Sequence, residues 1–145
     1  MTNTLIVNET FTSIQGESDR IGLPTFFIRL TGCRLRCSYC DTQYAYNQGE
    51  TLSIDEIIAY AQNSGTRHVT VTGGEPLLQK NALQLMTRLC DLNFDVTLET
   101  GGSESTSSVD PRVIRIIDLK TPDSGEHEKN HLENIPLLRQ EDQVK

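Results

Sequence analysis

Three of the four cysteines are grouped at a spacing typical of metal ligation. Cys33, Cys37 and Cys40 lie within eight positions of one another, whereas Cys90 stands alone. A closed structural zinc site needs four ligands. Three thiolates suit a [4Fe–4S] cluster that keeps one iron open to a substrate or cofactor. The spacing therefore favours a cluster, and we interpret Cys90, on the apolar side of a predicted helix, as a buried free thiol.

Two other interpretations of the cysteines stay open. The first is a zinc site whose fourth ligand is one of the three histidines, His68, His127 or His131. The second is a redox pair formed by Cys37 and Cys40, which leaves Cys33 without a role. A non-catalytic zinc module would account for the cysteines but not for the motifs that follow the predicted strands.

The elements that must position these residues alternate between strand and helix. Strands are predicted over residues 25–30, 68–72, 94–99 and 113–119, because these segments are rich in β-branched and aromatic side chains. A helix is predicted to begin after Ser53, where Glu56 completes a capping box. A second helix is predicted to have Pro76 in its first turn and to close at Asn93. Helix-length connections between strands imply right-handed parallel units in one α/β domain over residues 1–145.

A polar or glycine-rich motif directly follows each predicted strand. TGCRLRCSYCDT follows the first strand, GGEP the second, TGGS the third, and Lys120-Thr121-Pro122 the fourth. GGEP alone is also compatible with a simple strand-to-helix turn. Parallel α/β folds assemble their sites from loops at the carboxyl ends of the strands. The four motifs therefore predict one site on one rim of a partial (β/α) barrel.

The charge balance restricts the class of partner. The 145 residues carry 13 Lys and Arg against 20 Asp and Glu, which gives a net charge of −7. Binding to nucleic acid or to an anionic membrane needs clustered cations, so neither partner is expected. The sequence has no apolar run long enough to span a bilayer, and its N-terminus has no basic segment before an apolar stretch. We therefore expect a cytoplasmic protein.

The cysteine loop, Tyr39 just before its last cysteine, and GGEP after the next strand together resemble the radical S-adenosylmethionine superfamily. FTSIQGES and FIRLTGC, followed by CDT after the last cysteine, are similar to the 7-carboxy-7-deazaguanine synthase family within it. The resemblance implies a carbon–nitrogen lyase of queuosine biosynthesis, a tRNA modification pathway. Its reaction converts 6-carboxy-5,6,7,8-tetrahydropterin to 7-carboxy-7-deazaguanine with loss of ammonia. The implied cofactors are a [4Fe–4S] cluster, S-adenosylmethionine and Mg²⁺.

The resemblance also implies roles for the residues that match the family's motifs. The cluster would be bound by Cys33, Cys37 and Cys40, and Mg²⁺ by Thr42. S-adenosylmethionine would contact Tyr39, Cys40, Asp41, Gly74, Asp118, Leu119 and Lys120. The pterin would contact Ile14, Gln15, Gly16, Glu17, Arg29 and Thr72, with Arg29 at its carboxylate. No catalytic residue is implied.

Several of these assignments have a simpler structural alternative. A charge in an apolar strand is costly unless it is paired, and Glu99 or Asp118 could pair with Arg29 instead of a substrate carboxylate. IQGES could be a plain loop that turns at Gly16, Thr42 a turn residue, and Lys120 a solvated loop charge.

The resemblance extends to partners and to chain length. It implies a small pterin substrate, an electron donor such as flavodoxin or ferredoxin, and a homodimer by analogy. A glycyl-radical-enzyme activase has the same cysteine spacing but should lack Arg29 and the IQGE segment. Family members are usually longer than this sequence, which ends at Gln143-Val144-Lys145. We therefore expect a radical SAM barrel that is incomplete at its C-terminus, without the family's final strand and C-terminal segment.

Overall fold

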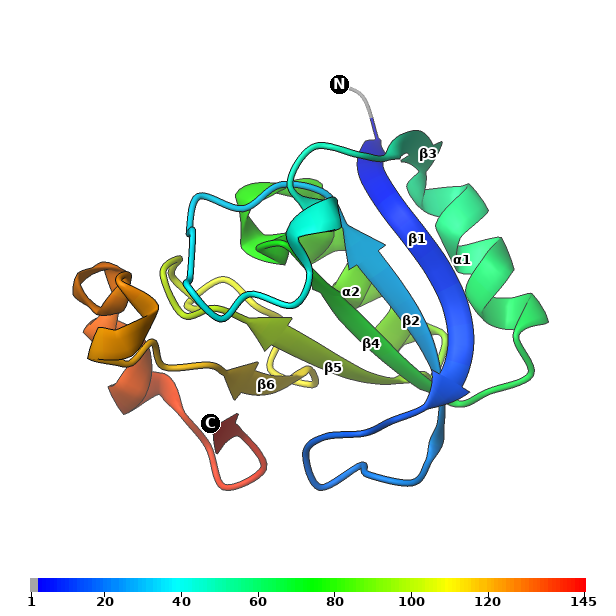
Figure 1. Ribbon diagram of the computed structural model, residues 1–145. Helices are drawn as coiled ribbons and strands as arrows, with labels where there is room; N and C mark the ends of the chain where they lie inside the picture. The colour runs from blue at the N-terminus through cyan, green and yellow to red at the C-terminus, as the bar shows by residue number, and fades with distance from the viewer. Residues whose placement is uncertain (1–2) are drawn as a thin grey trace.

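A mixed seven-stranded sheet forms the centre of the computed structural model (Figure 1), which describes residues 3–145. Met1 and Thr2, the first residues of the N-terminal stretch considered above, lie outside that range. The strands are β1 (Thr4–Ile14), β2 (Pro24–Leu30), β3 (Glu50–Ser53), β4 (His68–Gly73), β5 (Asp95–Thr100), β6 (Ile114–Ile117) and β7 (Gln143–Val144). Their order is β3-β1-β2-β4-β5-β6-β7. Within the described residues the sheet stays open, which confirms an α/β fold with a partial barrel.

The parallel part of the sheet was predicted, whereas its antiparallel edge was not. Neighbouring strands from β2 through β4, β5 and β6 to β7 pair in parallel, and Arg29 of β2 faces Thr72 of β4 in the register. β1 and β3 pair antiparallel beside β2. The sequence of β1 becomes polar after Val7, so it lacks the continuous apolar run that identified the other strands. β7 is short and lies in polar sequence, and it was not predicted either.

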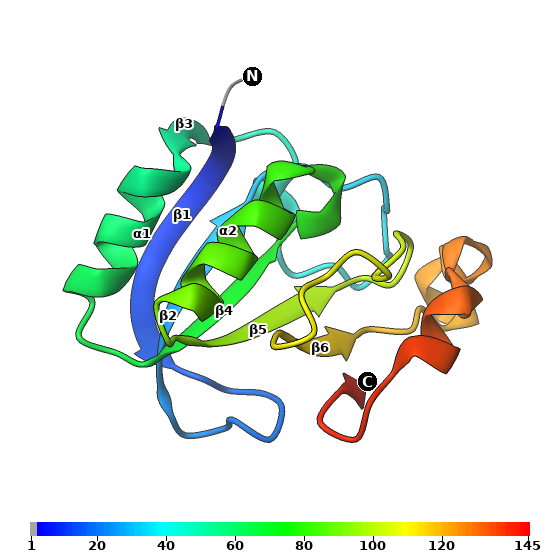
Figure 2. The ribbon, with the colours of Figure 1, turned by 180° about the vertical axis from the view of Figure 1, so that it is seen from behind.

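Two helices, α1 (Ile54–Asn63) and α2 (Asn81–Asp91), cover one face of the sheet (Figure 2). The predicted capping box of α1 is confirmed, since the Ser53 and Glu56 side chains each bond the other's backbone N–H. Alternate residues of the strands pack against these helices, as the two-residue period of a strand requires. In β2 the inward set includes Phe26, Ile28 and Leu30. The other set faces the opposite side of the sheet. Among residues 3–145, no helix has the length and apolar character needed to cross a membrane.

The second helix begins later than predicted. Pro76 opens a short 3₁₀ turn, η2 (Pro76–Leu78), and α2 starts only at Asn81. Gln79 separates the two because its backbone is extended and its side-chain amide donates to the carbonyls of Ile6 and Thr31, at 2.9 and 3.0 Å. The Gln79 side chain thus ties the segment that follows β4 to β1 and β2. At the other end Asn93, with a positive φ of 66°, closes the helix as predicted.

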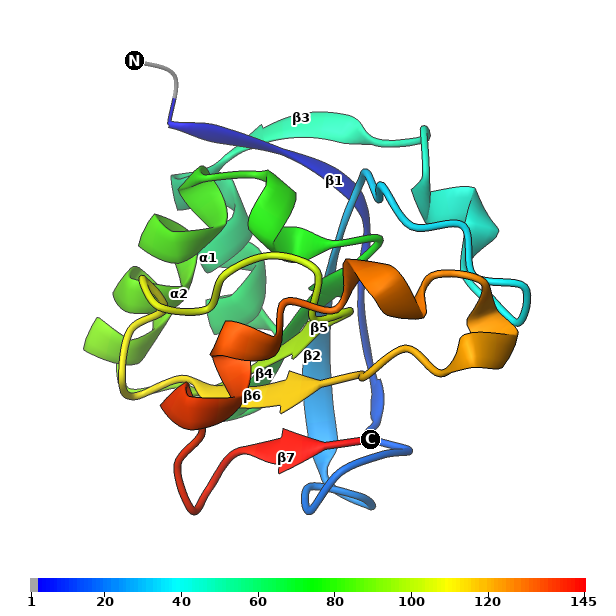
Figure 3. The ribbon, with the colours of Figure 1, turned by 90° about the vertical axis from the view of Figure 1, so that its left-hand side faces the viewer.

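The connection between β6 and β7 consists of short 3₁₀ turns instead of an α-helix. η3 (Pro122–Ser124), η4 (His127–Lys129) and η5 (Leu132–Leu137) lead from β6 to β7. Figure 3 shows this orange and red segment reaching from β6 past the cyan cysteine loop and back to β7. The Ser38 N–H donates to the Ser124 carbonyl at 3.0 Å, so the segment contacts the cysteine loop directly.

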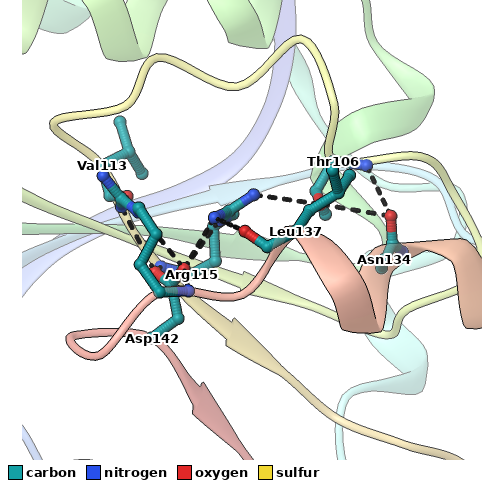
Figure 4. A network of polar contacts seen from close by, with 7 residues as sticks. Thr106, Val113, Arg115, Asn134, Leu137 and Asp142 are labelled. Atoms are coloured by element: carbon teal, nitrogen blue, oxygen red, sulfur yellow. Dashed lines mark hydrogen bonds and ion pairs between the residues drawn. The ribbon is translucent and has the colours of Figure 1, made fainter.

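A buried ion pair holds the C-terminal segment against β6 (Figure 4). Arg115 of β6 lies 2.7 Å from Asp142, and their side chains are 9% and 0% exposed. Asp142 also accepts from the Arg139 backbone N–H at 2.9 Å, and Arg115 donates to the Leu137 carbonyl. Burial alone would raise the pKa of Asp142, but the hydrogen bonds from Arg115 and Arg139 outweigh it and lower the pKa. The pair therefore stabilises the fold above the ordinary carboxyl pKa, and this stabilisation is lost as the pH falls through the lowered value.

We expect Asp142→Asn to lower the free energy of unfolding by about 3 kcal/mol, because it leaves the Arg115 charge buried without its partner. Asp55→Asn is the matched control, since Asp55 forms an exposed ion pair with Arg88 and should cost less than about 1 kcal/mol. Urea denaturation at neutral pH measures both changes. Equal losses from the two variants would contradict the importance given to the buried pair.

Candidate active site

A cavity of about 420 Å³ lies at the carboxyl ends of the parallel strands, on the face of the sheet away from α1 and α2. This volume is within the range of small-molecule sites, roughly 300–1,000 Å³. Its walls come from the strand positions that alternate with the core: Phe27 and Arg29 of β2, Thr72 of β4 and Glu99 of β5. All of the predicted site residues line this cavity except Leu119. The prediction of a single site on one rim therefore agrees with the geometry.

The cysteine loop forms one wall of the cavity. Cys33, Cys37 and Cys40 are free, half-buried and part of the lining, while Cys90 is buried and lies outside it. The Cys40 N–H donates to the Cys37 carbonyl at 3.1 Å and turns the loop between these two cysteines. Burial is the main cause that raises the pKa of Cys33 and of Cys37. Ligation of iron by thiolates would release the thiol protons.

The donor set fits a cluster better than a single metal ion. Among residues 3–145, no three His, Cys, Asp or Glu side chains are arranged to hold one ion between them. A [4Fe–4S] cluster does not require that convergence, because each thiolate binds a different iron. The histidines of the zinc interpretation, all within the described chain, lie outside the cavity lining: His68, His127 and His131. Three free cysteines on one loop of the cavity wall are the donor set that a cluster with an open iron would use.

Gly74 brings the GGEP segment into contact with the start of the cysteine loop. A Cβ at position 74 would lie 2.0 Å from the Gly32 carbonyl oxygen and 3.2 Å from the Cys33 Cβ, so only glycine fits there. The Glu75 N–H donates to the same Gly32 carbonyl at 2.6 Å. The interpretation of GGEP as a strand-to-helix turn is thus correct for the local structure. The same turn also forms the floor of the cavity beside Cys33.

Glu75 is a buried structural residue of this floor. Its carboxylate accepts from the Thr100 hydroxyl at 2.9 Å, the Gly101 N–H at 2.7 Å and the Leu77 N–H at 3.1 Å. Burial raises the pKa of Glu75 against the opposing effect of these bonds. The side chain therefore ties the end of β4 to the end of β5, and two of the four rim motifs are joined through it.

Arg29 points into the cavity with an acidic partner that the sequence analysis did not consider. Its Nε lies 2.9 Å from Glu9 of β1, rather than pairing with Glu99 or Asp118. Tyr44 donates to the same Glu9 oxygen at 3.1 Å, and its ring lies 5.6 Å from the guanidinium carbon. Within the described chain, the two terminal nitrogens of Arg29 make no hydrogen bond. They are left to face the cavity with a fixed orientation.

Each residue of the IQGE segment contributes to the cavity wall in a different way. Gln15 is buried and its amide donates to Thr70 at 3.2 Å, so this side chain supports the loop from within. Ile14 and Gly16 are exposed at the cavity wall. Glu17 forms an ion pair with Lys145, which follows β7. The backbone of the segment and the Glu17 carboxylate are therefore its surfaces toward the cavity.

The residues after Cys40 and after β6 complete the rim. Thr42 lines the cavity and donates to Asp41 at 2.7 Å. Lys120 is largely buried, pairs with Asp118 at 2.8 Å and lies 5.9 Å from the Tyr39 ring, which contradicts its interpretation as a solvated charge. Burial alone would lower the pKa of Lys120, but Asp118 outweighs it and raises the pKa.

Leu119 is the predicted contact that faces away from the cavity. Its N–H donates to the Lys145 carbonyl at 2.9 Å, continuing the pairing of β6 with β7. Successive residues of an extended chain point to opposite sides, so the Leu119 side chain is not among the lining residues, whereas Asp118 and Lys120 are.

Two charged residues that line the cavity were not among the predicted site residues: Glu99, which was considered only as an ion-pair partner of Arg29, and Lys145. Glu99 is the last residue but one of β5, on the face opposite the core, and one of its oxygens has no hydrogen-bond partner among residues 3–145. Burial raises the pKa of Glu99, against the opposing charge of Lys145. A polar residue at the end of a strand, directly before a glycine motif, was the available signal for Glu99. Nothing in the polar tail pointed to Lys145.

Comparison with known proteins agrees with this geometry. A family model described as the Radical SAM superfamily matches residues 27–122. A 7-carboxy-7-deazaguanine synthase of Chlorobaculum tepidum is 47% identical over 137 residues, which cover 94% of this chain and 62% of that protein. The protein of the same name from Thermoplasma acidophilum is 32% identical over 143 residues, which cover 97% and 68%.

A solved structure is also similar. The crystal structure of QueE from Escherichia coli superimposes with a TM-score of 0.73 at 28% sequence identity, covering 81% of this chain and 61% of that one. The chain spans about three fifths of the length of the first curated relatives it matches.

The cysteine assignments lead to a direct test. Replacing Cys33, Cys37 or Cys40 by Ala should reduce the iron and sulfide content of the anaerobically reconstituted chain to near zero, because each thiolate would hold one iron. Cys90→Ser should keep the iron and cost only about 1 kcal/mol of stability. Visible absorbance and iron analysis measure the result. Iron binding that depends on Cys90 but survives loss of one of the other three would show the assignment to be wrong.

Proposed function

Because the chain belongs to the radical SAM superfamily and, within it, to the 7-carboxy-7-deazaguanine synthase family, we propose that its cavity is where 6-carboxy-5,6,7,8-tetrahydropterin is converted to 7-carboxy-7-deazaguanine. The reaction contracts the pterin ring with loss of ammonia, in queuosine biosynthesis. One observation carries the proposal: the cysteine loop and the inward-facing Arg29 line the same cavity. The proposed cluster site and the proposed carboxylate receptor would thus share one small volume.

Membership of the superfamily implies a [4Fe–4S] cluster and S-adenosylmethionine. When bound, this pair supplies a carbon-centred radical that starts the rearrangement. Cys33, Cys37 and Cys40 would hold the cluster. The contacts proposed for S-adenosylmethionine are Tyr39, Cys40, Asp41, Gly74, Asp118 and Lys120, all on the cavity wall. Leu119, the remaining residue implied by the resemblance, is not among the lining residues, so its contact would have to come from the backbone.

Arg29 is the proposed receptor for the pterin carboxylate. Glu9 binds only its Nε, so the terminal nitrogens can form a charge-assisted bond to a carboxylate. The Arg29 side chain is only 15% exposed, which keeps competing water away from the pair. Glu9 and Tyr44 hold the guanidinium in place before the substrate arrives. The strand position that looked costly from the sequence thus has both a resting partner and a proposed ligand.

The aminopyrimidinone part of the pterin carries N–H donors and a carbonyl acceptor. We assign their recognition to the backbone of Ile14 and Gly16 and to the Glu17 carboxylate, with Thr72 at the opposite wall. Gln15 supports them from beneath, since its side chain and both its backbone groups already bond within the protein.

The proposal includes Mg²⁺ at Thr42, beside the substrate carboxylate. A hydroxyl oxygen is a neutral hard ligand of the kind Mg²⁺ accepts together with water and substrate oxygens. Asp41, bonded to the same hydroxyl, orients it. The proposal also includes a one-electron donor such as flavodoxin or ferredoxin, because the cluster must be reduced in each cycle, and a homodimer by analogy with the family.

Turnover of the pterin by the anaerobically reconstituted protein tests the function. We expect product formation that depends on S-adenosylmethionine, and Arg29→Gln should raise KM for the pterin at least tenfold, since a hydrogen bond to a charged group contributes about 1.5–3 kcal/mol. Arg67→Gln is the control, because Arg67 is an exposed residue paired with Asp95 outside this cavity. Cleavage of S-adenosylmethionine without any effect of the pterin would favour a glycyl-radical-enzyme activase instead.

The magnesium assignment has its own test. Thr42→Ala should weaken the Mg²⁺ dependence of turnover while the iron content stays unchanged, because the hydroxyl ligand is lost and the cysteines are not. Thr42→Ser, which keeps the hydroxyl, should be much milder. Titration of activity with Mg²⁺ compares the two variants. Equal damage from both would support Thr42 as a turn residue only.

A further inference from the structure

Glu99 carries a buried carboxylate oxygen, Oε1, that has no hydrogen-bond partner among residues 3–145. Leaving a buried acceptor without a donor is costly, and the great majority of buried polar atoms in proteins are paired. The Glu99 side chain lines the cavity, so a bound molecule can supply the missing donor. Glu99 has no part in the contacts proposed for the pterin or for S-adenosylmethionine.

Glu99 lies at the end of a row of cavity side chains that crosses three neighbouring strands. In the register of the sheet, Arg29 of β2 is opposite Thr72 of β4. The pairing of β4 with β5 places Val71 opposite Leu98, so the residues that follow them, Thr72 and Glu99, are level with each other. Arg29, Thr72 and Glu99 all line the cavity. The row thus has a cation at one end, a hydroxyl in the middle and a carboxylate at the other end.

The two ends of the row define the chemistry of a ligand that could lie along it. Neighbouring strands are about 4.8 Å apart, so Arg29 and Glu99 are separated by about 10 Å across the sheet. The terminal nitrogens of Arg29 call for an anionic group, because Glu9 binds only its Nε. The Oε1 of Glu99 calls for an N–H or O–H donor. A two-ring heterocycle with a carboxylate at one end and N–H donors at the other meets both requirements.

An aromatic surface adjoins the cationic end of the row. Phe27 precedes Arg29 by two residues in β2, so both side chains point to the same side of the sheet. The Phe27 ring stacks on Phe11 of β1, with 4.9 Å between the ring centroids and 11° between the ring planes. Both phenylalanines line the cavity. A flat ring bound along the row would therefore have apolar surface to contact beside Arg29.

Lys145 favours the charged form of Glu99. Burial raises the pKa of Glu99, and the positive charge of Lys145 opposes that rise. Lys145 also lines the cavity and forms an ion pair with Glu17. A bound N–H donor would oppose the rise as well, because it stabilises the carboxylate rather than the neutral acid. In a complex, Glu99 would therefore act as a hydrogen-bond acceptor.

We propose that Glu99 is a specificity-determining residue of the pterin site, whose Oε1 accepts an N–H of the aminopyrimidinone ring while Arg29 binds the carboxylate. The inference rests on the proposed function, which names the pterin, and it adds which end of the ring points toward β5. It also means that the site rejects a ring with a carbonyl in place of the amino group. Two acceptors would then face each other without a proton between them.

The test is equilibrium binding, measured by calorimetry on the anaerobically reconstituted chain. The two probes are 6-carboxy-5,6,7,8-tetrahydropterin and its analogue with an oxygen in place of the 2-amino group. The parent chain should bind the pterin at least about tenfold more tightly than the analogue, because a hydrogen bond to a charged group is lost with the amino group.

Glu99→Gln should weaken binding of the pterin and strengthen binding of the analogue. The glutamine amide has nearly the same shape as the carboxylate, but it can donate to the added carbonyl as well as accept. Opposite changes in the two affinities are not expected from a general loss of structure. Glu133→Gln is the matched control, since the Glu133 side chain is 80% exposed and lies outside the cavity lining, and it should leave both affinities unchanged.

The outcomes separate the inference from the proposed function. A parent chain that binds neither compound overturns both. A parent chain that binds the pterin but forms no product with S-adenosylmethionine overturns the proposed function alone. Equal affinity of the parent chain for the two compounds overturns the inference alone, and this result needs no variant. A Glu99→Gln chain that loses both affinities by the same factor also overturns it, because Glu99 would then only support the fold.

Discussion

The close approach of two backbones at the ends of β2 and β4 is the constraint on which the site depends. The parallel pairing of these strands ends with Leu30 opposite Gly73. The next residues then meet without side chains between them, and the Gly32 carbonyl accepts the Glu75 N–H at 2.6 Å. Any side chain at position 74 would push the GGEP turn away from the cysteine loop. The spacing between the cluster ligands and the proposed S-adenosylmethionine contacts is therefore set by glycine.

One face of the sheet packs against the helices and the other lines the cavity. The two-residue period of the strands determines which side chains each face carries. Phe26 and Ile28 pack against the helices, while Phe27 and Arg29 face the cavity. The same alternation separates Leu98 from Glu99 at the end of β5. A polar residue can be introduced at a cavity position without removing apolar contact from the core, because its side chain never enters the core. The fold can thus carry a charged site directly against its hydrophobic core.

Motifs that are local in sequence were predicted well, and features that need tertiary contacts were not. The cysteine loop, GGEP and the capping box at Ser53 are complete within a few residues, so they could be found in the sequence, although GGEP gained a functional interpretation only through the resemblance. The partner of Arg29 could not be found in this way. Glu9 becomes its neighbour only through the antiparallel pairing of β1 with β2, and β1 has no continuous apolar run. The interruption between η2 and α2 likewise depends on a tertiary contact, because the Gln79 side-chain amide donates to a carbonyl of β1.

The C-terminal segment was the least predictable part, since its order comes from a buried ion pair rather than from an apolar face. Arg115 lies in a strand whose other residues look purely hydrophobic, and Asp142 lies in a polar tail. Sequence patterns weigh such residues as surface charges. Only the fold shows that both are removed from solvent and bonded to each other.

The same ion pair stabilises the C-terminal segment, which forms part of the cavity wall, separately from the hydrophobic core. Between η3 and β7 the apolar side chains of Leu132, Leu137 and Val144 are exposed, so we expect this segment to open more readily than the helices and central strands. Amide hydrogen exchange would then be faster in this segment than in β2 and β4. Because Lys145 and the pairing of β6 with β7 belong to the segment, each opening would also withdraw a positive charge from Glu17 and Glu99. The electrostatic character of the cavity would then be coupled to the folding of this segment.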